Sequence, residues 1–132
     1  MSDFCAALRG RLLADAGVAG LVATRIHWGV VPPRTPRPYI RLQLVSGDRP
    51  RTLDEFEEAR TARVQCDSFA DTHADAHAIA EAVIAALAEP ATFGGIQFGG
   101  IGATEPRDLG EDSDQGFIHR ASTDLLAEHS RA

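Results

Sequence analysis

Two histidines and two nearby acids are the residues of this sequence whose types and spacing come closest to a metal site. His73 and His77 are four residues apart, the spacing at which two ligands on one helix bind zinc. Asp71 and Asp75 are close to them in sequence, but on a helical wheel they point roughly 160° away. The four side chains cannot converge on one ion. We therefore expect no metal, and two histidines that flank the apolar face of a helix.

Neither cysteine has the setting of a nucleophile or of a disulfide scaffold. Cys5 falls on the apolar stripe of a first helix, and Cys66 alternates with Val64 on the inward face of a strand. Free cysteine is most often a small core residue, so both thiols are expected to be reduced and inert. The glycines of 94–102 match no phosphate-binding or dinucleotide pattern, and the acids of 105–114 lack a calcium-loop pattern and are expected to be solvated. The sequence contains none of these catalytic or cofactor-binding patterns, which predicts a protein that is not an enzyme and has no cofactor.

Length, net charge and hydropathy exclude further classes of protein. The 132 residues suffice for one domain, and the 44% that are apolar can form a core. The formal net charge of −6 argues against a nucleic-acid-binding domain, whose affinity comes from a basic face. No apolar run approaches the roughly 20 residues that span a bilayer, and the first residues lack a signal-peptide pattern. We expect a single soluble, non-exported domain over residues 1–132.

Apolar periodicity predicts two helices and four to five strands. The helices are expected at residues 3–14 and 72–88, and the strands at 25–31, 39–44, 62–67, 95–101 and 117–126. Gly17 and Gly20 are expected to interrupt the chain after the first helix. Because most neighbouring strands are joined without a helix, the fold class is α+β. The expected architecture is a mainly antiparallel sheet with two helices packed on one face, in the order α-β-β-β-α-β-β.

The other face of the sheet is expected to be polar and to carry cross-strand ion pairs. Its charged residues are Arg41, Arg63, Asp67, Arg120 and Asp124. Such a face is either a solvated surface or a subunit interface, and the residues leave both alternatives open.

A long connection at residues 46–60 is expected to form an exposed loop or an extended hairpin arm. It carries charges of both signs, namely Arg49, Arg51, Asp54, Glu55, Glu57 and Glu58. Loops of this length in compact domains usually have a function. These residues, with Arg41 and Arg63 of the polar face, are our candidate interface residues.

Five stretches, in their order along the chain, together resemble a known family. They are residues 12–22 (LLADAGVAGLV), 25–26 (RI), 38–40 (PYI), 64–70 (VQCDSFA) before an alanine-rich helix, and 120–124 (RASTD). In this order and in a chain of this length they resemble the tail-completion family of long-tailed bacteriophages, prophages and gene transfer agents. The resemblance covers nearly the whole chain.

The resemblance implies a structural virion protein, the tail terminator or tail-to-head joining protein. Such a protein is made in the bacterial host cytoplasm and forms a homohexameric ring on the head-proximal end of the tail. Its implied partners are further copies of itself, the tail tube protein and a head-completion or connector protein, while DNA passes through the ring without sequence-specific binding. Two alternatives remain. One is another neck ring, such as the head-completion stopper, and the other is a small cytoplasmic ligand- or metal-binding domain or enzyme that uses His73 and His77.

Overall fold

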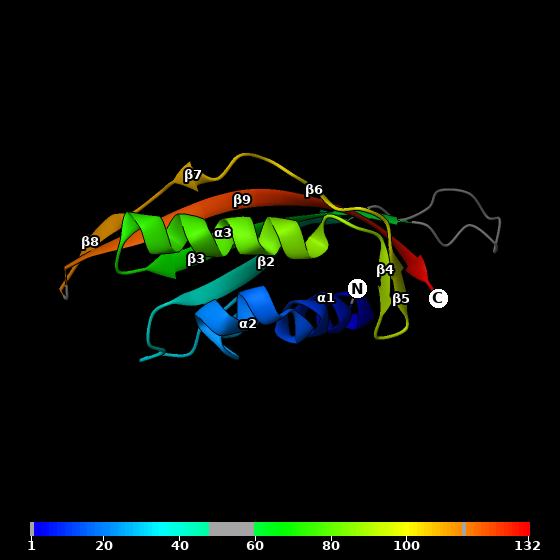
Figure 1. Cartoon of the computed structure of the whole chain (residues 1–132), viewed down its shortest axis with the longest axis horizontal. Coiled ribbons are helices and arrows are strands. Elements are labelled where there is room, and N and C mark those ends of the chain that lie inside the picture. Colours follow the sequence, from blue (N-terminus) through cyan, green and yellow to red (C-terminus); the bar gives the residue numbers. More distant parts are fainter. Residues whose placement is uncertain (1, 48–59, 115) are drawn as a thin grey trace.

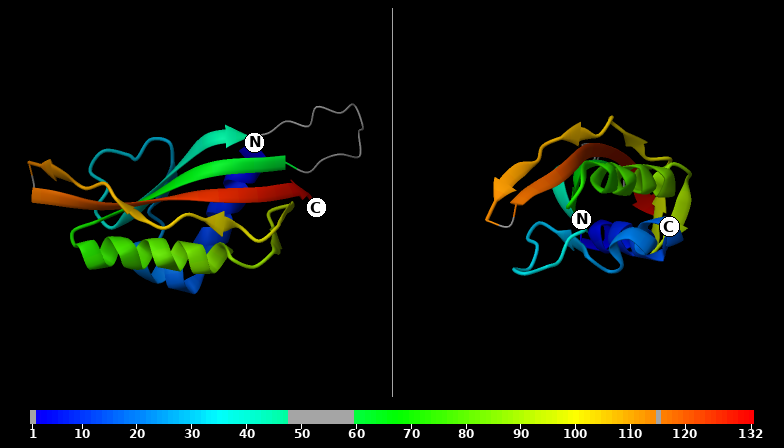
Figure 2. Two further views of the ribbon diagram at one scale, coloured as in Figure 1. Left: turned by 90° about the horizontal axis from the view of Figure 1, so that it is seen from above. Right: turned by 60° about the vertical axis from the view of Figure 1, so that its left-hand side comes forward.

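Three helices and a curled sheet of nine strands make up residues 2–47, 60–114 and 116–132, which this computed structural model describes. In chain order the elements are α1 (Ser2–Ala14), α2 (Ala16–Val22), β1 (Ile26–Trp28), β2 (Tyr39–Gly47), β3 (Arg60–Ala70), α3 (His73–Leu87), β4 (Ala91–Phe93), β5 (Ile96–Phe98), β6 (Gly102–Ala103), β7 (Arg107–Asp108), β8 (Glu111–Ser113) and β9 (Gly116–Arg131). The sheet curls around α3, and the helices lie on its concave side (Figure 1, Figure 2). The expected α+β class is confirmed.

The strand β9 organises the sheet. It pairs with β3 in unbroken antiparallel register from Arg60↔His129 to Ala70↔His119. Its other edge is covered in succession by β8, β7, β6 and β5, and β4 pairs with β5. On the far side, β2 pairs with β3, and β1 with β2. Among the described residues only the β1–β2 pair is parallel, so the expectation of a mainly antiparallel sheet is confirmed.

The expected strand count and the order α-β-β-β-α-β-β are wrong. A second helix follows the first, and six strands follow α3 where two were expected. The expected solvated turn at 105–114 contains β7 and β8, which pair with β9. Strands of two or three residues are too short to show a period of two in the sequence. They form because the edge of β9 offers unpaired backbone donors and acceptors.

The extra helix, α2, contains the two glycines that were expected to interrupt the chain. Asp15 caps it, since its carboxylate accepts a hydrogen bond from the Val18 amide at 3.0 Å. Val18 and Val22 are buried beneath it. A cap of about 1 kcal/mol and two buried valines outweigh the roughly 1 kcal/mol that each of Gly17 and Gly20 costs. Within the described ranges, no helix combines the length and apolarity needed to cross a membrane.

The core lies between the concave face of the sheet and the helices. On α1 the expected stripe is confirmed for Phe4, Leu8 and Leu12, which are buried, while Cys5 is half-buried at its edge. The buried residues of α3 are Ala76, Ile79, Ala80, Val83 and Leu87. They meet inward residues of the central strands, among them Ile40, Leu42, Val64, Cys66, Ala121 and Leu125.

The buried Cys66 thiol is expected to be inert in the folded protein. Burial raises its pKa to about 12, and the charge of Asp67 acts in the same direction. Because the thiolate is the reactive species, a thiol reagent at pH 8 should modify Cys66 only after denaturation. The measurement is thiol titration of the Cys5→Ser variant with and without urea. Rapid modification of that variant without urea would contradict the burial of Cys66.

His129 is expected to make the fold sensitive to mild acid. Its ring packs on Phe4 with centroids 4.2 Å apart, and burial, together with the positive charge of Arg60, lowers its pKa below 6.5. The unfolded chain therefore binds the proton more readily, so stability is lost as pH falls through about 6.5 towards the folded pKa. Urea unfolding between pH 7.5 and 5.5 should show a smaller loss in His129→Leu than in the unmodified chain. Parallel losses in the two proteins would refute this prediction.

Candidate assembly surface and a histidine–aspartate cluster

The convex face of β2, β3 and β9, here called the outer face, carries the polar residues that alternate with the core. Arg41, Arg63, Asp67, Arg120 and Asp124 all have the outward parity, because their neighbours along each strand are core residues. The sequence-based placement of these five residues is therefore confirmed. The outer face is rigidly held, since it lies on the three longest strands of the sheet.

One ion pair of the outer face has a fully buried carboxylate. Arg41 and Asp67 are register partners across β2 and β3, and Arg41 donates from Nη2 to Asp67 Oδ2 at 2.9 Å. The Asp67 side chain is wholly inaccessible to solvent. The amide nitrogen of Gln65 also donates to both Asp67 oxygens, at 3.1 and 3.2 Å. Such a carboxylate depends on these donors, because a buried charge without partners is strongly destabilising.

Beside this pair lies an arginine–aromatic cluster, formed by Tyr39, Phe69, Arg41 and Arg120. The two aromatic rings stack with centroids 4.8 Å apart. The guanidinium carbons of Arg41 and Arg120 lie 5.4 and 5.8 Å from the Phe69 centroid. The Nε atoms of both arginines are buried and have no hydrogen-bond acceptor among the described residues. Arginine and aromatic side chains are the types enriched in protein interfaces.

The other end of the outer face is more exposed and partly apolar. Asp124 lies 3.5 Å from both Arg63 Nη1 and Arg107 Nη2. Leu126 is 47% exposed. A half-open hollow of about 240 Å³ lies at this end, and it is lined by Arg63, Gly102, Ala103, Thr104, Asp124, Leu125 and Leu126. An ion pair beside an accessible leucine is the mixture found where an interface core meets its rim.

The structure places two of the eight candidate interface residues, Arg41 and Arg63, on the outer face. The other six, Arg49, Arg51, Asp54, Glu55, Glu57 and Glu58, lie outside the described residues. Sequence reasoning missed Phe69 as a member of this face, and it missed Arg107 of β7, which lies 3.5 Å from Asp124. Phe69 is buried, although it has the outward parity on β3. The alternation of residues along this strand could have placed it on the outer face.

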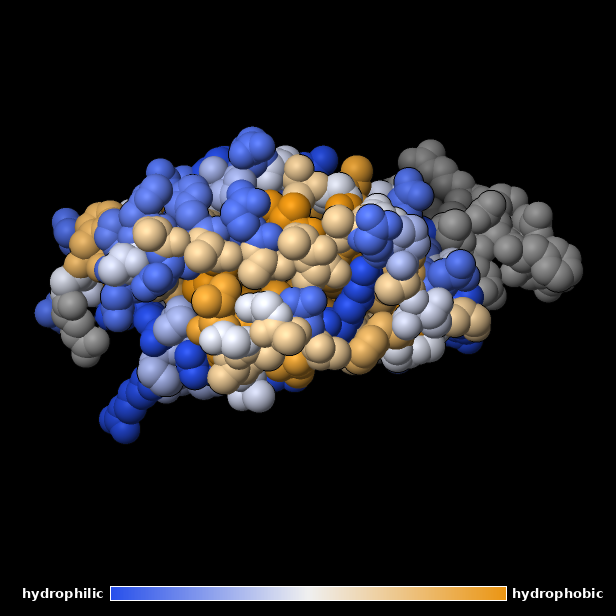
Figure 3. All heavy atoms as spheres, viewed as in Figure 1, coloured by the Kyte–Doolittle hydropathy of each residue, from blue (hydrophilic) through white to orange (hydrophobic). Residues whose placement is uncertain are grey.

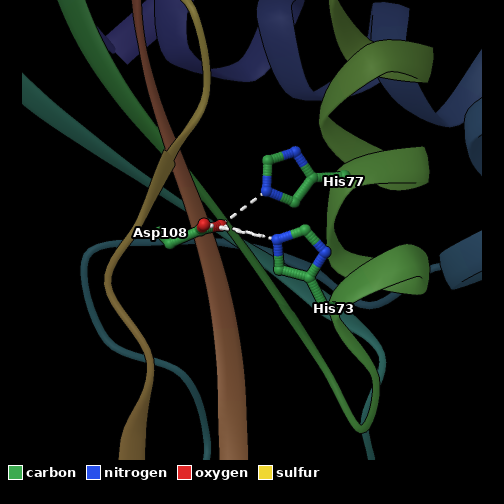
Figure 4. A group of neighbouring side chains, drawn as sticks. All are labelled: His73, His77 and Asp108. Atoms are coloured by element: carbon green, nitrogen blue, oxygen red, sulfur yellow. Dashed lines mark hydrogen bonds and ion pairs between the residues drawn. The ribbon is translucent and has the colours of Figure 1, made fainter.

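A second group of side chains lies on the concave side, where the start of α3 faces β7. His77 Nε2 lies 2.6 Å from Asp108 Oδ1, and His73 Nε2 lies 3.1 Å from the same oxygen. Figure 4 shows both rings directed from α3 towards the carboxylate. The hydrogen bonds of the two histidines lower the pKa of Asp108. Asp108 is 64% exposed, as expected for the acids of 105–114, but it lies on the strand β7 and contacts the helix α3.

The exposed side of α3 is built from small apolar side chains. Figure 3 shows them as a pale band across the face of the molecule that α3 occupies. Ala74, Ala78 and Ala85 are among the exposed residues of this helix, and Glu81 is an acid between them. The charged side chains that form ion pairs in the described ranges lie mainly on the outer face and near the start of α3.

Comparison with family models assigns the chain to a protein family. The model described as tail completion protein gp17 matches residues 6–125, which include most of α1 and most of β9. The chain belongs to the tail completion protein gp17 family. It is a structural protein of the virion tail, and the expected resemblance is confirmed.

A solved structure also has the fold of this tail completion protein. A chain in the virion of a native gene transfer agent particle superposes with a TM-score of 0.67 and 23% sequence identity. The match covers 95% of the present chain and 92% of the other. Comparison with individual curated proteins gave no match.

Proposed function

We propose that this protein is a tail terminator: a non-enzymatic subunit of a homohexameric ring that ends the tail tube and joins the tail to the head. Its proposed partners are neighbouring copies, the tail tube protein on one side and a head-completion or connector protein on the other. The observation that carries the proposal is the family match over residues 6–125. The shared fold of a chain in a gene transfer agent virion supports it.

The outer face has the properties that a ring interface requires. A cyclic ring is closed by head-to-tail contacts, in which one patch of a subunit meets a different patch of its neighbour. The arginine–aromatic cluster provides a rigid first patch, in which the partly exposed Tyr39, Arg41 and Arg120 surround the buried Phe69 ring. We propose that the charged connection at 48–59 adds to the second patch.

The net charge suits a passage for DNA. Six copies with a formal charge of −6 each give a ring with 36 negative charges. Acids that face the lumen would repel the phosphate backbone, so DNA would pass without adhering.

Solution mass is the first test of the ring. Light scattering after size-exclusion chromatography, across a concentration series, should give a species near six times 14.1 kDa or a monomer–hexamer equilibrium. If only monomer is found, pelleting with purified tail tubes tests assembly on a template, which helps when each contact is weak. A dimer at every concentration, or a monomer that binds no tail tube, would overturn the proposal. Binding to the portal side instead of the tube would favour the stopper ring.

A charge reversal tests whether the outer face makes the contact. Arg63→Glu should abolish the hexamer or the tube complex, because it reverses the charge that an exposed side chain of the outer face presents to a neighbouring subunit. Glu81→Arg, on the exposed side of α3, is the matched control and should assemble normally. Assembly of Arg63→Glu at the level of the control would leave the outer face as a solvated surface.

A further inference from the structure

The cluster of His73, His77 and Asp108 has the composition and spacing of an open transition-metal site. One nitrogen of each histidine and one oxygen of Asp108 all lie within 4.8 Å of one another. Two imidazoles and a carboxylate are the donor set that zinc accepts, whereas magnesium and calcium prefer oxygen donors alone. We propose that these three residues bind a divalent transition metal of the zinc class.

The distances between the donor atoms are close to those of a tetrahedral site. Two donors that are each about 2.0–2.1 Å from zinc lie about 3.3 Å apart. His73 Nε2 is already 3.1 and 3.3 Å from the two oxygens of Asp108. The 2.6 Å contact with His77 has to lengthen, and Asp108 can move because its side chain is 64% exposed. Metal binding therefore needs a small carboxylate shift and no rearrangement of the backbone.

Two independent elements hold the donors. The cap of α3, where Thr72 Oγ1 accepts from the Asp75 amide at 3.1 Å, fixes the turn that carries His73 and His77. Asp108 is held by the pairing of β7 with Ser122 and Ala121 of β9. The two histidine rings lie with centroids 4.3 Å apart, so their nitrogens approach the ion from adjacent directions. The exposed side of the cluster leaves the remaining coordination positions to water.

Asp71 and Asp75, the acids first considered as ligands, do not join this group. Asp71 forms an ion pair with Arg37 at 2.6 Å, and the Asp75 amide takes part in the helix cap. Without Asp108 the cluster would be two histidines at the positive end of a helix dipole, which disfavours a cation. The negative charge of the Asp108 carboxylate outweighs the effect of the helix dipole, so that the cluster favours a cation.

A bound ion would join β7 to α3. β7 pairs with β9 over only two residues, and Thr104 and Leu109 on either side of it each donate one backbone hydrogen bond to β9, so this segment is held to the sheet by a short ladder. A metal shared by Asp108 and the two histidines would fix this segment against the helix. Binding to the folded state alone raises stability by mass action. The proposal does not depend on ring formation.

The test uses the full chain without a histidine tag, dialysed against ZnSO₄ at pH 7.5 and analysed for metal. One zinc per chain is expected. At free zinc about a hundredfold above Kd, the thermal midpoint should rise by several degrees, and EDTA should reverse the rise. His77→Ala should lose stoichiometric binding, while His27→Ala, on β1, should retain it.

Asp108→Asn separates a metal site from a set of hydrogen bonds. The amide preserves the size of the side chain and is a poor zinc ligand, so zinc binding and the zinc-dependent rise should both be lost while the circular dichroism spectrum is unchanged. Zinc bound equally by His73→Ala/His77→Ala and by the unmodified chain would overturn the proposal. So would the absence of stoichiometric zinc at the highest free zinc concentration that stays soluble at pH 7.5.

Discussion

Arg41→Leu should lower the free energy of unfolding by about 3 kcal/mol, the low end of the range for breaking a buried ion pair. The reason is the Asp67 carboxylate, which is wholly buried and has no other cation in an ion pair with it among the described residues. Gln65 still donates to it, which keeps the loss from being larger. Urea unfolding at pH 7 measures the change.

The matched control is Arg63→Leu on the same face. Its partner Asp124 is 3.5 Å away and also contacts Arg107, and the Arg63 side chain is largely exposed. Exposed pairs contribute less than about 1 kcal/mol. In Arg41→Leu/Asp67→Leu most of the stability should return, since apolar replacement of both partners removes the unpaired charge. Equal losses in the two single variants would show that the burial of Asp67 does not matter.

Leu42→Ala should destabilise the fold by about 2–5 kcal/mol, the range for a leucine removed from a closed core. Leu42 is fully buried on β2, and its neighbours on the concave face have little room to close the cavity. The measurement is again urea unfolding, with the midpoint and slope fitted separately.

Leu44→Ala on the same strand is the comparison for Leu42. Leu44 is 40% exposed, at the end of β2 where the register with β3 shifts between Leu44 and Ser46. A loss of less than about 1 kcal/mol is expected. If Leu44→Ala were as damaging as Leu42→Ala, the core would extend further along β2 than its burial indicates.

Long periodic elements of this protein were predictable from sequence, and elements made by tertiary pairing were not. The expected helix at 72–88 corresponds to α3, and the expected strand at 62–67 is the centre of β3. By contrast, α2 was hidden because its glycines have low helix propensity, while the cap by Asp15 and the buried valines outweigh that cost. The strands β6 to β8 have no period to detect and exist only because β9 offers them an edge.

The candidate site residues also differ in whether the sequence could predict them. Alternation along β2, β3 and β9 was enough to place Arg41 and Arg63 on the outer face. The helical spacing of His73 and His77 was visible too, but their partner was not, because Asp108 is 31 residues beyond His77 in the chain. A contact of that kind depends on strand pairing and sheet curl, which local sequence patterns do not specify.

The central position of β9 has a consequence for the nascent chain. Its register with β3 joins residues 60–70 to residues 119–129, so the main pairing of the sheet is also one of its most distant in sequence. Until β9 has left the ribosome, β3 has a bare edge and the apolar side of α3 has only half of its sheet to cover. Such non-local pairing slows folding and leaves intermediates that aggregate. During synthesis, the edge of β3 is therefore open to mispairing until β9 has been made.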